Sequence, residues 1–514
     1  MDNNKRTDGK LMHAGLLALK RGNTVSLYNG YSATAGRRNG LRLRISLVAA
    51  VTTVLFIGSS WAHETSGSRQ TGRNRFLVLD SRIIDNTENA KLTLGQPQKH
   101  PANPLFGEDK PWEARFDNLY ANVIYDEEEK IYKCWYNPFI VDYSARGMTP
   151  EEREKPYKVP SNREDGLCYA TSKDGIKWDK PELGLVEFDG SAQNNIVWRT
   201  GPGIWGHGGG IFKDPLDLDP GRRYKAMFKS HVMSVGISAD GIHWDKSIPC
   251  PEANADGDTH NNAFWAPTLG KYVGITRLHG KYGRQVARIE SDDFVKWSKA
   301  EVVLEGLNKN LQTYAMPAFF HGGVYLGLVA IHDQKADRVW TELTWSPDTV
   351  KWNRVCPGAP LIANSQKEMA YDWGCVYASA CPIFLDDQIR IYYGGCDGNH
   401  YGWRNGFFCL ATLRPDGFAG YEPIDSEAWA IVTTKPIIFA GRNLCISADI
   451  PPGEFVKVVV KDEQGNKIAV GKRTRQTVTD GPVQWLENKN LLGKRVRLEF
   501  VINTAKLYSF SFTD

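Results

Sequence analysis

Long apolar stretches with helical spacing are scarce in this sequence of 514 residues. The chain instead carries 49 glycines, 16 tryptophans and 21 tyrosines, a composition that favours turn-rich β structure. Because one ordinary core cannot absorb this length, the chain must hold several domains or a repeat architecture. The composition therefore predicts an all-β protein in which repeats have to be sought first.

A large charge of one sign is also missing from most of the chain. Residues 1–62 contain nine Lys or Arg and two Asp, a net charge of +7, whereas the whole chain has +4. The remainder is therefore slightly acidic, and no basic stripe is left that would indicate binding to nucleic acid.

Metal-ligand spacing is absent as well. The nine cysteines are an odd number and are scattered along the chain without the short Cys or His intervals of a metal site. The sequence therefore predicts no metal and no cofactor. Some of the thiols can pair after export, and the sequence leaves the pairing open.

The N-terminus has the pattern of a secretory signal. Basic residues at 37–44 precede an apolar run at 45–58, and Ser60-Trp61-Ala62 has the small residues of a cleavage site. We expect cleavage after Ala62 and a secreted or periplasmic protein. The apolar run is shorter than the ~20 residues of a membrane span, and an uncleaved anchor is the alternative.

One pattern recurs between residues 120 and 425: two strands, a loop, and a hairpin marked by Ser, Asp and Trp. Asp-Gly suits a tight turn, and the Trp ring packs on the neighbouring strand, so these aspartates are expected to be scaffold. The copies are counted at Asp174, Asp240, Asp292, Asp348 and a degenerate Asp416.

Five such units predict a five-bladed β-propeller of four-stranded blades. After residue 441 the period changes, and 455–460 and 496–501 read as half-buried strands with a hairpin turn at 462–465. The predicted parts are a leader at 1–62, an N-terminal extension at 63–100, the propeller at 101–440 and a small β-sandwich at 441–514.

In a propeller the starts of the innermost strands converge on an axial funnel. Asp117, Asp258 and Asp372 precede three different inner strands at similar offsets, so we expect them to meet. Two such carboxylates can divide the work of glycoside cleavage between a proton donor and a base or nucleophile. The alternative is that each accepts backbone hydrogen bonds in a loop.

Other residues at the same strand starts, together with Arg277 just after the second strand of blade three, are candidates for binding a sugar. The aromatic rings could stack on sugar faces, and the polar groups could hydrogen-bond to hydroxyls. These candidates are Trp112, Glu113, Arg115, His207, His260, Arg277, Tyr314 and Trp373.

The five hairpins, the Trp112-Glu113 pair and the trailing sandwich resemble the five-bladed glycoside hydrolases, above all families 32 and 43. The resemblance implies a blade-one nucleophile or base, for which Asp117 is the candidate, and a third-blade proton donor, for which Asp258 is the candidate. It also implies a second-blade aspartate that this sequence lacks, so Asp372 or Glu113 is expected to replace it.

The sequence thus predicts an exported hydrolase acting on a poly- or oligosaccharide. A propeller that binds sugar without cleaving it is one alternative. A phosphorolytic enzyme like family 130 is another, for which Arg277, Arg284 and Arg288 are the local cluster that could bind phosphate.

Overall fold

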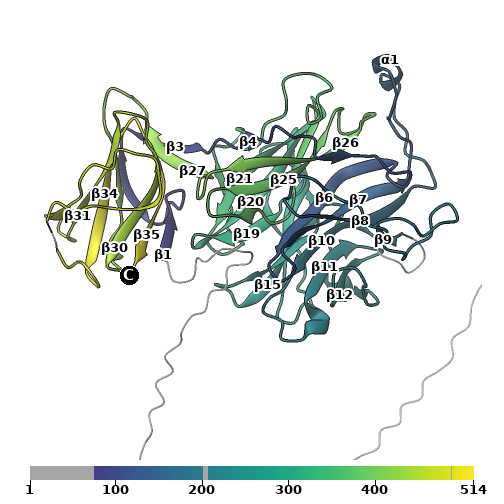
Figure 1. Cartoon of the computed structure of the whole chain (residues 1–514), viewed down its shortest axis with the longest axis horizontal. Coiled ribbons are helices and arrows are strands. Elements are labelled where there is room, and N and C mark those ends of the chain that lie inside the picture. The colour runs from purple at the N-terminus through teal and green to yellow at the C-terminus, as the bar shows by residue number, and fades with distance from the viewer. Residues whose placement is uncertain (1–73, 201–205, 488) are drawn as a thin grey trace, which may run out of the picture. The chain divides into compact units, whose positions relative to one another are not determined.

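Strands make up nearly all regular structure in the computed structural model, which describes residues 74–200, 206–487 and 489–514 (Figure 1). Within these ranges the helices are α1 (Pro150–Arg153) and two 3-10 turns, η1 (Pro220–Arg222) and η2 (Pro251–Ala253). None of them is long and apolar enough to cross a membrane. The all-β prediction is confirmed, and the leader with its cleavage site after Ala62 lies outside the described residues.

The first three blades are separate antiparallel sheets of four strands each. Blade one consists of β6 (Arg115–Asp126), β7 (Ile131–Val141), β8 (Glu164–Ser172) and β9 (Ile196–Arg199). Blade two consists of β10 (His207–Lys213), β11 (Tyr224–Lys229), β12 (Met233–Ser238) and β13 (Ile248–Pro249). Blade three consists of β14 (Asn262–Ala266), β15 (Lys271–Gly280), β16 (Gly283–Ser291) and β17 (Glu301–Leu304).

The last two blades each split their inner strand in two. In blade four, β18 (Leu311–Thr313) and β19 (Ala318–His321) both pair with β20 (Val324–Asp333), followed by β21 (Arg338–Ser346) and β22 (Asn353–Val355). In blade five, β23 (Cys375–Ala378) and β24 (Ile383–Phe384) pair with β25 (Ile389–Cys396), followed by β26 (Gly406–Leu413).

Blade five takes its outer strand from the segment that directly precedes blade one. The short strands β4 (Gln98–Lys99) and β5 (Phe106–Gly107) pair with β26, and the chain then continues into β6 of blade one. Because the segment before the first blade completes the last one, the two ends of the repeat are tied together. The prediction of five blades is confirmed.

The inner strands are joined by hydrogen bonds from a buried amide. Asn122 of β6 donates from Nδ2 to the carbonyl oxygen of Gly209 (2.7 Å) and accepts at Oδ1 from the N–H of Ile211 (3.0 Å). A Cβ at Gly210 would lie 1.8 Å from the carbonyl oxygen of Asn261, so only glycine lets the start of β10 approach blade three this closely.

Glu108 joins blade one to blade five. Its Oε1 accepts hydrogen bonds from the N–H groups of Phe116 (2.7 Å) in β6 and Gly406 (2.8 Å) in β26. Burial raises the pKa of Glu108 to about 7, against the lowering effect of these hydrogen bonds and of Arg115. A carboxyl group in this contact therefore changes its protonation state near neutral pH.

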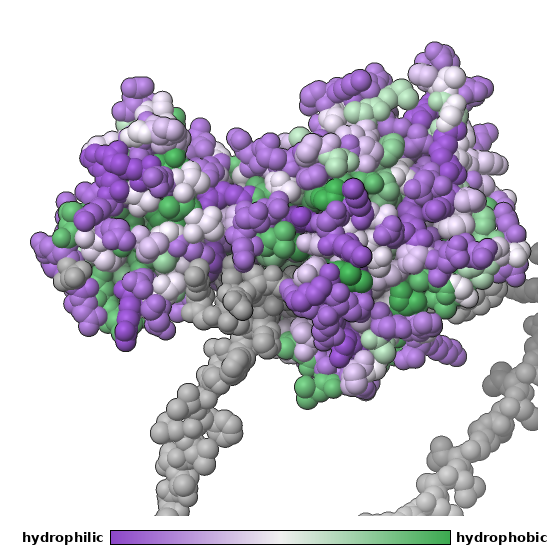
Figure 2. Space-filling view, viewed as in Figure 1, coloured by the Kyte–Doolittle hydropathy of each residue, from purple (hydrophilic) through white to green (hydrophobic). Residues whose placement is uncertain are grey.

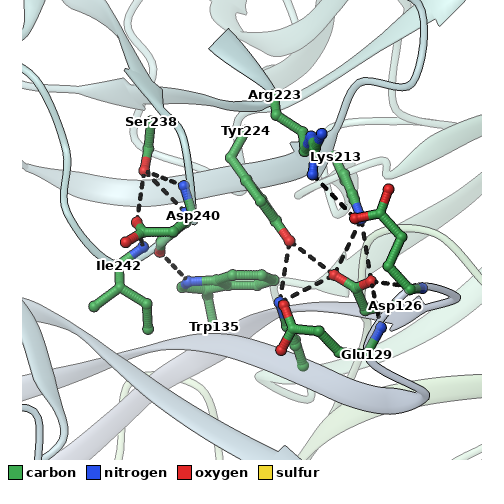
Figure 3. A network of polar contacts seen from close by, with 12 residues as sticks. Asp126, Glu129, Trp135, Lys213, Arg223, Tyr224, Ser238, Asp240 and Ile242 are labelled. Atoms are coloured by element: carbon green, nitrogen blue, oxygen red, sulfur yellow. Dashed lines mark hydrogen bonds and ion pairs between the residues drawn. The ribbon is translucent and has the colours of Figure 1, made fainter. Parts of the chain in front are cut away.

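A second contact joins blades one and two at the end of β6 (Figure 3). The buried Asp126 accepts a hydrogen bond from Tyr224 of β11 (2.9 Å) and makes ion pairs with Lys133 (3.0 Å) and Lys213 (3.1 Å). Burial raises the pKa of Asp126, but the hydrogen bonds from the two lysines and Tyr224 outweigh it and hold the pKa well below the usual range.

The same contact is repeated between the next blades. Asp214 accepts from Tyr272 of blade three (2.6 Å) and from Lys225 (2.8 Å). Between blades three and four a threonine takes the place of the aspartate, with Thr268 Oγ1 lying 2.6 Å from the hydroxyl of Tyr325. Each of these tyrosines is near the start of the second strand of its blade, so the repeat carries its own connection to the preceding unit.

The predicted hairpin turns are scaffold in the first four copies, with one change of residue. In the second copy Asp240 Oδ1 accepts from the N–H groups of Ile242 and His243, both at 2.8 Å. In the third copy Asp293, not Asp292, makes the equivalent bonds. The degenerate fifth copy differs: Asp416 is buried, and it accepts from His321 (2.9 Å) and Ser509 (2.6 Å) and pairs with Arg75.

Two further sheets form the sandwich. One has the order β3-β27-β35-β30-β33, with β1 paired to β35, and the other has β2-β28-β34-β31-β32, with β29 paired to β34. The N-terminal extension supplies β1 (Asn74–Leu77), β2 (Ile84–Glu88) and β3 (Ala90–Leu94). Next along the chain are β27 (Ala419–Pro423), β28 (Ala430–Thr434) and β29 (Ile437–Ile438).

The remaining sandwich strands come from the C-terminal part. They are β30 (Asn443–Asp449), β31 (Phe455–Lys461), β32 (Lys467–Val470), β33 (Val478–Pro482), β34 (Arg495–Asn503) and β35 (Lys506–Thr513). The two predicted strands and the turn at 462–465 are found here. The two sandwich sheets thus combine strands from before residue 100, from 419–438 and from after residue 440. The predicted domain boundaries at 100/101 and 440/441 stay predictions.

The face shown in Figure 2 is mostly hydrophilic, with hydrophobic residues scattered singly or in small groups. Isolated exposed apolar side chains are ordinary on protein surfaces and indicate no particular partner. Among the residues coloured in Figure 2, no apolar area stands out that would mark a docking surface.

We predict that Tyr224→Phe destabilises the protein by about 1–3 kcal/mol, since it removes a hydrogen bond to the buried carboxylate of Asp126. Urea unfolding at pH 7 measures this. The ionised carboxylate of Asp126 stabilises the fold at pH values above its unfolded-state pKa of ~4, and this stabilisation is lost progressively as the pH falls from there towards the lower pKa of the folded state. The difference in stability between the variant and the wild type should therefore shrink in acid. Tyr125→Phe is the matched control, and equal effects of the two substitutions would contradict the prediction.

We also predict that Glu108→Gln makes stability less dependent on pH. The amide oxygen of Gln can keep both backbone hydrogen bonds. With a folded pKa raised to about 7, the wild type loses stability as pH rises from ~4.5 through 7. Thermal unfolding of both proteins at pH 5 and pH 8 should therefore show a gain for the variant at the higher pH. A constant difference at both pH values would disprove the assignment.

Candidate active site

Five side chains from blades one to four touch one another at the starts of the inner strands, and we call Tyr120, His207, Asp258, Arg277 and Tyr314 the central cluster. His207 begins β10, Asp258 precedes β14, Arg277 lies in β15 and Tyr314 follows β18. The Tyr120 ring lies 5.5 Å from the ring of His207. Four of these residues were predicted as site residues from their positions relative to the strands, and the fold does bring them together.

The centre of this cluster is the carboxylate of Asp258. Its Oδ2 accepts from Nη1 of Arg277 at 3.0 Å, and its Oδ1 lies 3.3 Å from Nε2 of His207. The side chain of Asp258 is 65% exposed, whereas that of Arg277 is 1% exposed. A solvent-facing carboxylate therefore rests on a buried guanidinium.

These contacts keep Asp258 ionised. The hydrogen bond to His207, together with the charges of His207, Arg277 and Arg284, holds the pKa of Asp258 well below its usual range, and partial desolvation by the surrounding protein does not outweigh them. A carboxylate of this kind suits a base or a nucleophile. The geometry thus disfavours the expected role of Asp258 as proton donor in the ligand-free protein.

His207 connects two carboxylates. While Nε2 faces Asp258, Nδ1 lies 3.3 Å from Oδ1 of Asp165 in β8. The imidazole is further bordered by Phe139, whose ring is stacked with it at 6.3 Å. Asp165 was missed by the sequence analysis because it lies at the start of a third strand, where no pattern marks a residue as facing the axis.

Two arginines stack on the ring of Tyr314. The guanidinium of Arg277 lies 4.5 Å and that of Arg284 5.0 Å from the centre of its ring. Arg277 also donates from Nη2 to the Tyr314 carbonyl oxygen (2.9 Å), and Arg284 donates to the hydroxyl of Tyr401 (2.9 Å). Arg288 instead bonds to Thr349 and Glu290, both at 2.7 Å, so only two of the three predicted arginines come together.

The histidines around the cluster are kept neutral. His260 is buried with Nε2 donating to Oδ1 of Asn122 (3.0 Å), and burial lowers its pKa to about 3. Burial also lowers the pKa of His332 and, more strongly, that of His400. His260 therefore supports the inner strands as a neutral imidazole, a structural part that its predicted role as a sugar ligand did not anticipate.

The predicted residues at the start of blade one bind residues outside the central cluster. Glu113 is buried, pairs with Lys180 at 2.8 Å, accepts from the hydroxyl of Tyr136 (2.6 Å), and has a pKa raised by burial. Trp112 donates from Nε1 to Oδ1 of Asn195 (2.7 Å). Arg115 donates to the carbonyl oxygen of Gly402 (3.0 Å) and stacks on Tyr157 (4.1 Å).

Asp372 occupies a buried ion pair in blade five. Its carboxylate is 0% exposed and lies 2.6 Å from Nζ of Lys99. It also accepts from the hydroxyls of Tyr393 (2.9 Å) and Ser365. The adjacent Trp373 stacks under Arg338 at 4.7 Å. Asp372 shares none of its described contacts with Asp258, so the expectation that it joins the same site has no support in this geometry.

Asp117 lies in β6, one residue before Asn118. Asn118 donates to the hydroxyl of Tyr120 (2.9 Å) and accepts from Arg404 (3.1 Å), so this part of β6 borders the central cluster. The side chain of Asp117 lies outside what the structure describes. In the described residues, no group of three or more His, Cys, Asp or Glu side chains could hold a metal ion.

No protein-family model matches this sequence, and no curated protein matches it. Solved structures of similar fold include a glycosyl hydrolase from Bacteroides ovatus, with 15% identity, a TM-score of 0.41, and coverage of 65% of this chain and 97% of that one. An α-L-arabinofuranosidase from Podospora anserina in complex with cellotriose has 14% identity, a TM-score of 0.41, and coverage of 62% and 97%.

A third similar structure is an N-acetylgalactosamine deacetylase from F. plautii in complex with blood group B trisaccharide. It has 15% identity, a TM-score of 0.39, and coverage of 64% of this chain and 97% of that one. What the chain's own strands define is its class, a five-bladed β-propeller with a β-sandwich.

We predict that Asp372→Asn lowers stability by about 3–5 kcal/mol, because it leaves Lys99 partly buried without its counter-charge. Chemical unfolding measures the loss. Lys99→Met, combined with it, should recover part of the stability if the ion pair is structural. Unchanged stability of the single variant would contradict the ion pair and make a catalytic part for Asp372 worth testing again.

Proposed function

We propose that this chain is an exported glycoside hydrolase that cleaves a poly- or oligosaccharide at the central cluster. The observation that carries the proposal is the carboxylate of Asp258, open to solvent and held ionised between His207 and Arg277 where the inner strands begin. Export is proposed from the signal pattern that ends at Ala62.

Glycoside hydrolysis requires one carboxylic acid that protonates the leaving oxygen and one carboxylate that acts as base on water or as nucleophile. Since Asp258 is held ionised, we assign it the second part. We assign proton donation to Asp117, because β6 brings Asn118 and Tyr120 to the same cluster. Asp117 and Asp258 thus exchange the roles of base or nucleophile and proton donor that the sequence predicted, and they remain the proposed catalytic pair.

His207 and Arg277 serve this mechanism by holding Asp258 in place. Both lie within 3.3 Å of its oxygen atoms and approach it from different blades. Arg277 is itself held by the carbonyl oxygen and ring of Tyr314. Such support fixes the carboxylate before a substrate arrives, which lowers the cost of reaching the reactive geometry.

A phosphorolytic enzyme is the second candidate, and one observation favours it. Arg277 and Arg284 both stack on Tyr314, and the described hydrogen bonds of Arg284 go to the neutral acceptors Gln312 and Tyr401. Two neighbouring guanidinium groups are suited to binding an oxyanion such as phosphate. The two candidates differ in whether cleavage requires inorganic phosphate.

The test is sugar release from a broad panel of plant and algal polysaccharides by the full chain, with and without inorganic phosphate. We expect release without phosphate, and a loss of at least about 100-fold in Asp258→Asn and in Asp117→Asn. Asp292→Asn is the control, since its side chain is 83% exposed and pairs only loosely with Lys271 at 3.7 Å.

Each other outcome has a definite meaning. Release that appears only with phosphate would replace hydrolysis by phosphorolysis. Binding of a panel sugar without release, in a folded protein, would make the chain a carbohydrate-binding propeller. Full activity of Asp258→Asn would overturn the central cluster as the catalytic site, provided that circular dichroism shows the variant folded like wild type.

A further inference from the structure

Two of the nine cysteines face each other directly in blade five. Cys375 begins β23 and Cys396 ends β25, and these two residues are partners in the antiparallel register. Side chains of directly opposed residues lie on the same face of a sheet. Both thiols are buried. No other pair of cysteines is opposed in this way in the strand registers of the described residues.

The spacing of such partners suits a disulfide. Opposed residues in an antiparallel pair have Cα atoms about 4.5–5.5 Å apart, within the roughly 4.4–6.8 Å that a disulfide spans. We propose that Cys375 and Cys396 form a disulfide bond when the protein folds under oxidising conditions. This proposal does not rest on the proposed function.

The chain contains its own matched control. Cys134 of β7 and Cys168 of β8 are also buried in one sheet, but Cys134 faces Ala170 and Cys168 faces Tyr136. The two cysteines are therefore diagonal neighbours, for which Cα atoms are about 7–8 Å apart and beyond the reach of a disulfide without movement of the backbone. We therefore expect no disulfide between Cys134 and Cys168, although both are buried like Cys375 and Cys396.

The surroundings of Cys375 favour the reaction. Nη1 of Arg404 donates to its sulfur at 3.6 Å. Burial raises the pKa of Cys375, but the hydrogen bond from Cys396 and the charge of Arg404 outweigh it and lower the pKa, whereas that of Cys396 is raised. Cys375 is thus the thiol that becomes a nucleophilic thiolate.

The step balances with a disulfide oxidant such as oxidised glutathione. The Cys375 thiolate attacks one glutathione sulfur, which breaks the glutathione disulfide and releases one reduced glutathione. The Cys396 sulfur, after losing its proton, then attacks the mixed disulfide and releases the second. Two protein thiols are oxidised and one glutathione disulfide is reduced.

The cross-link would restrain the part of blade five that borders the central cluster. Tyr377, two residues after Cys375, bonds through its hydroxyl to Nδ1 of His400 (2.9 Å). Arg404, which touches Cys375, also bonds to Asn118 of β6 (3.1 Å). Holding β23 to β25 by a covalent bond therefore limits the movement of these contacts and raises resistance to unfolding.

The experiment is to refold the full chain in a buffer of reduced and oxidised glutathione, block free thiols, and map peptides by mass spectrometry without reduction. Refolding is used because both thiols are buried in the folded protein. We expect a linked pair of peptides containing Cys375 and Cys396, with Cys134 and Cys168 recovered as blocked thiols. Recovery of Cys375 or Cys396 as a blocked thiol, or linkage to any other cysteine, would overturn the proposal.

Thermal unfolding provides a second measurement. Reduction of the oxidised wild type should lower its Tm by several degrees, whereas the double variant Cys375→Ser, Cys396→Ser should show no change on reduction. An equal response of wild type and variant would assign the effect to another bond and refute this one. If the variant does not fold, the peptide map of the wild type still decides.

Discussion

The side-chain amide of Asn122 is the contact on which the centre of the propeller depends. Its nitrogen donates to the carbonyl oxygens of Tyr120 (3.1 Å) and Gly209 (2.7 Å), and its oxygen accepts from Ile211 and His260, both at 3.0 Å. All four hydrogen bonds available to an amide are thereby made in a fully buried position. One side chain thus holds strands of blades one and two and the segment before blade three, and removing it would leave several buried polar groups without partners.

This restraint explains how a charged cluster can exist beside the inner strands. With the strand starts held, Arg277 is buried against Tyr314 and needs a counter-charge, which Asp258 supplies from the solvent side. His260 and His400 are kept neutral by burial, and the groups that favour the ionised form of Asp258 are His207 first and then Arg277 and Arg284. Because the pKa of Asp258 lies well below its usual range, its carboxylate should stay ionised over the physiological pH range.

Much of the fold could be predicted because the repeat depends on interactions between residues that are close in the sequence. The turn aspartates and the paired strands follow from short-range hydrogen bonds and alternation, and the structure contains them. The central cluster was predictable in part, since His207, Asp258 and Tyr314 could be placed by their distance from inner strands, and Arg277 by its place at the end of the second strand of blade three. Asp372 and Glu113 satisfied the same rule, yet both are buried in ion pairs, because the rule says where a strand starts and not which way its preceding loop turns.

The sequence by itself determined the all-β class, the number of blades and the positions of most of the turns, because these depend on neighbours a few positions away. Only the tertiary structure decided which carboxylates are buried and which face solvent, and that two distant thiols are opposed. Lys99 and Asp372, like His207 and Asp258, come from different segments of the chain. The charge state and reactivity of a side chain are set by such neighbours, which the order of residues along the chain does not bring into view.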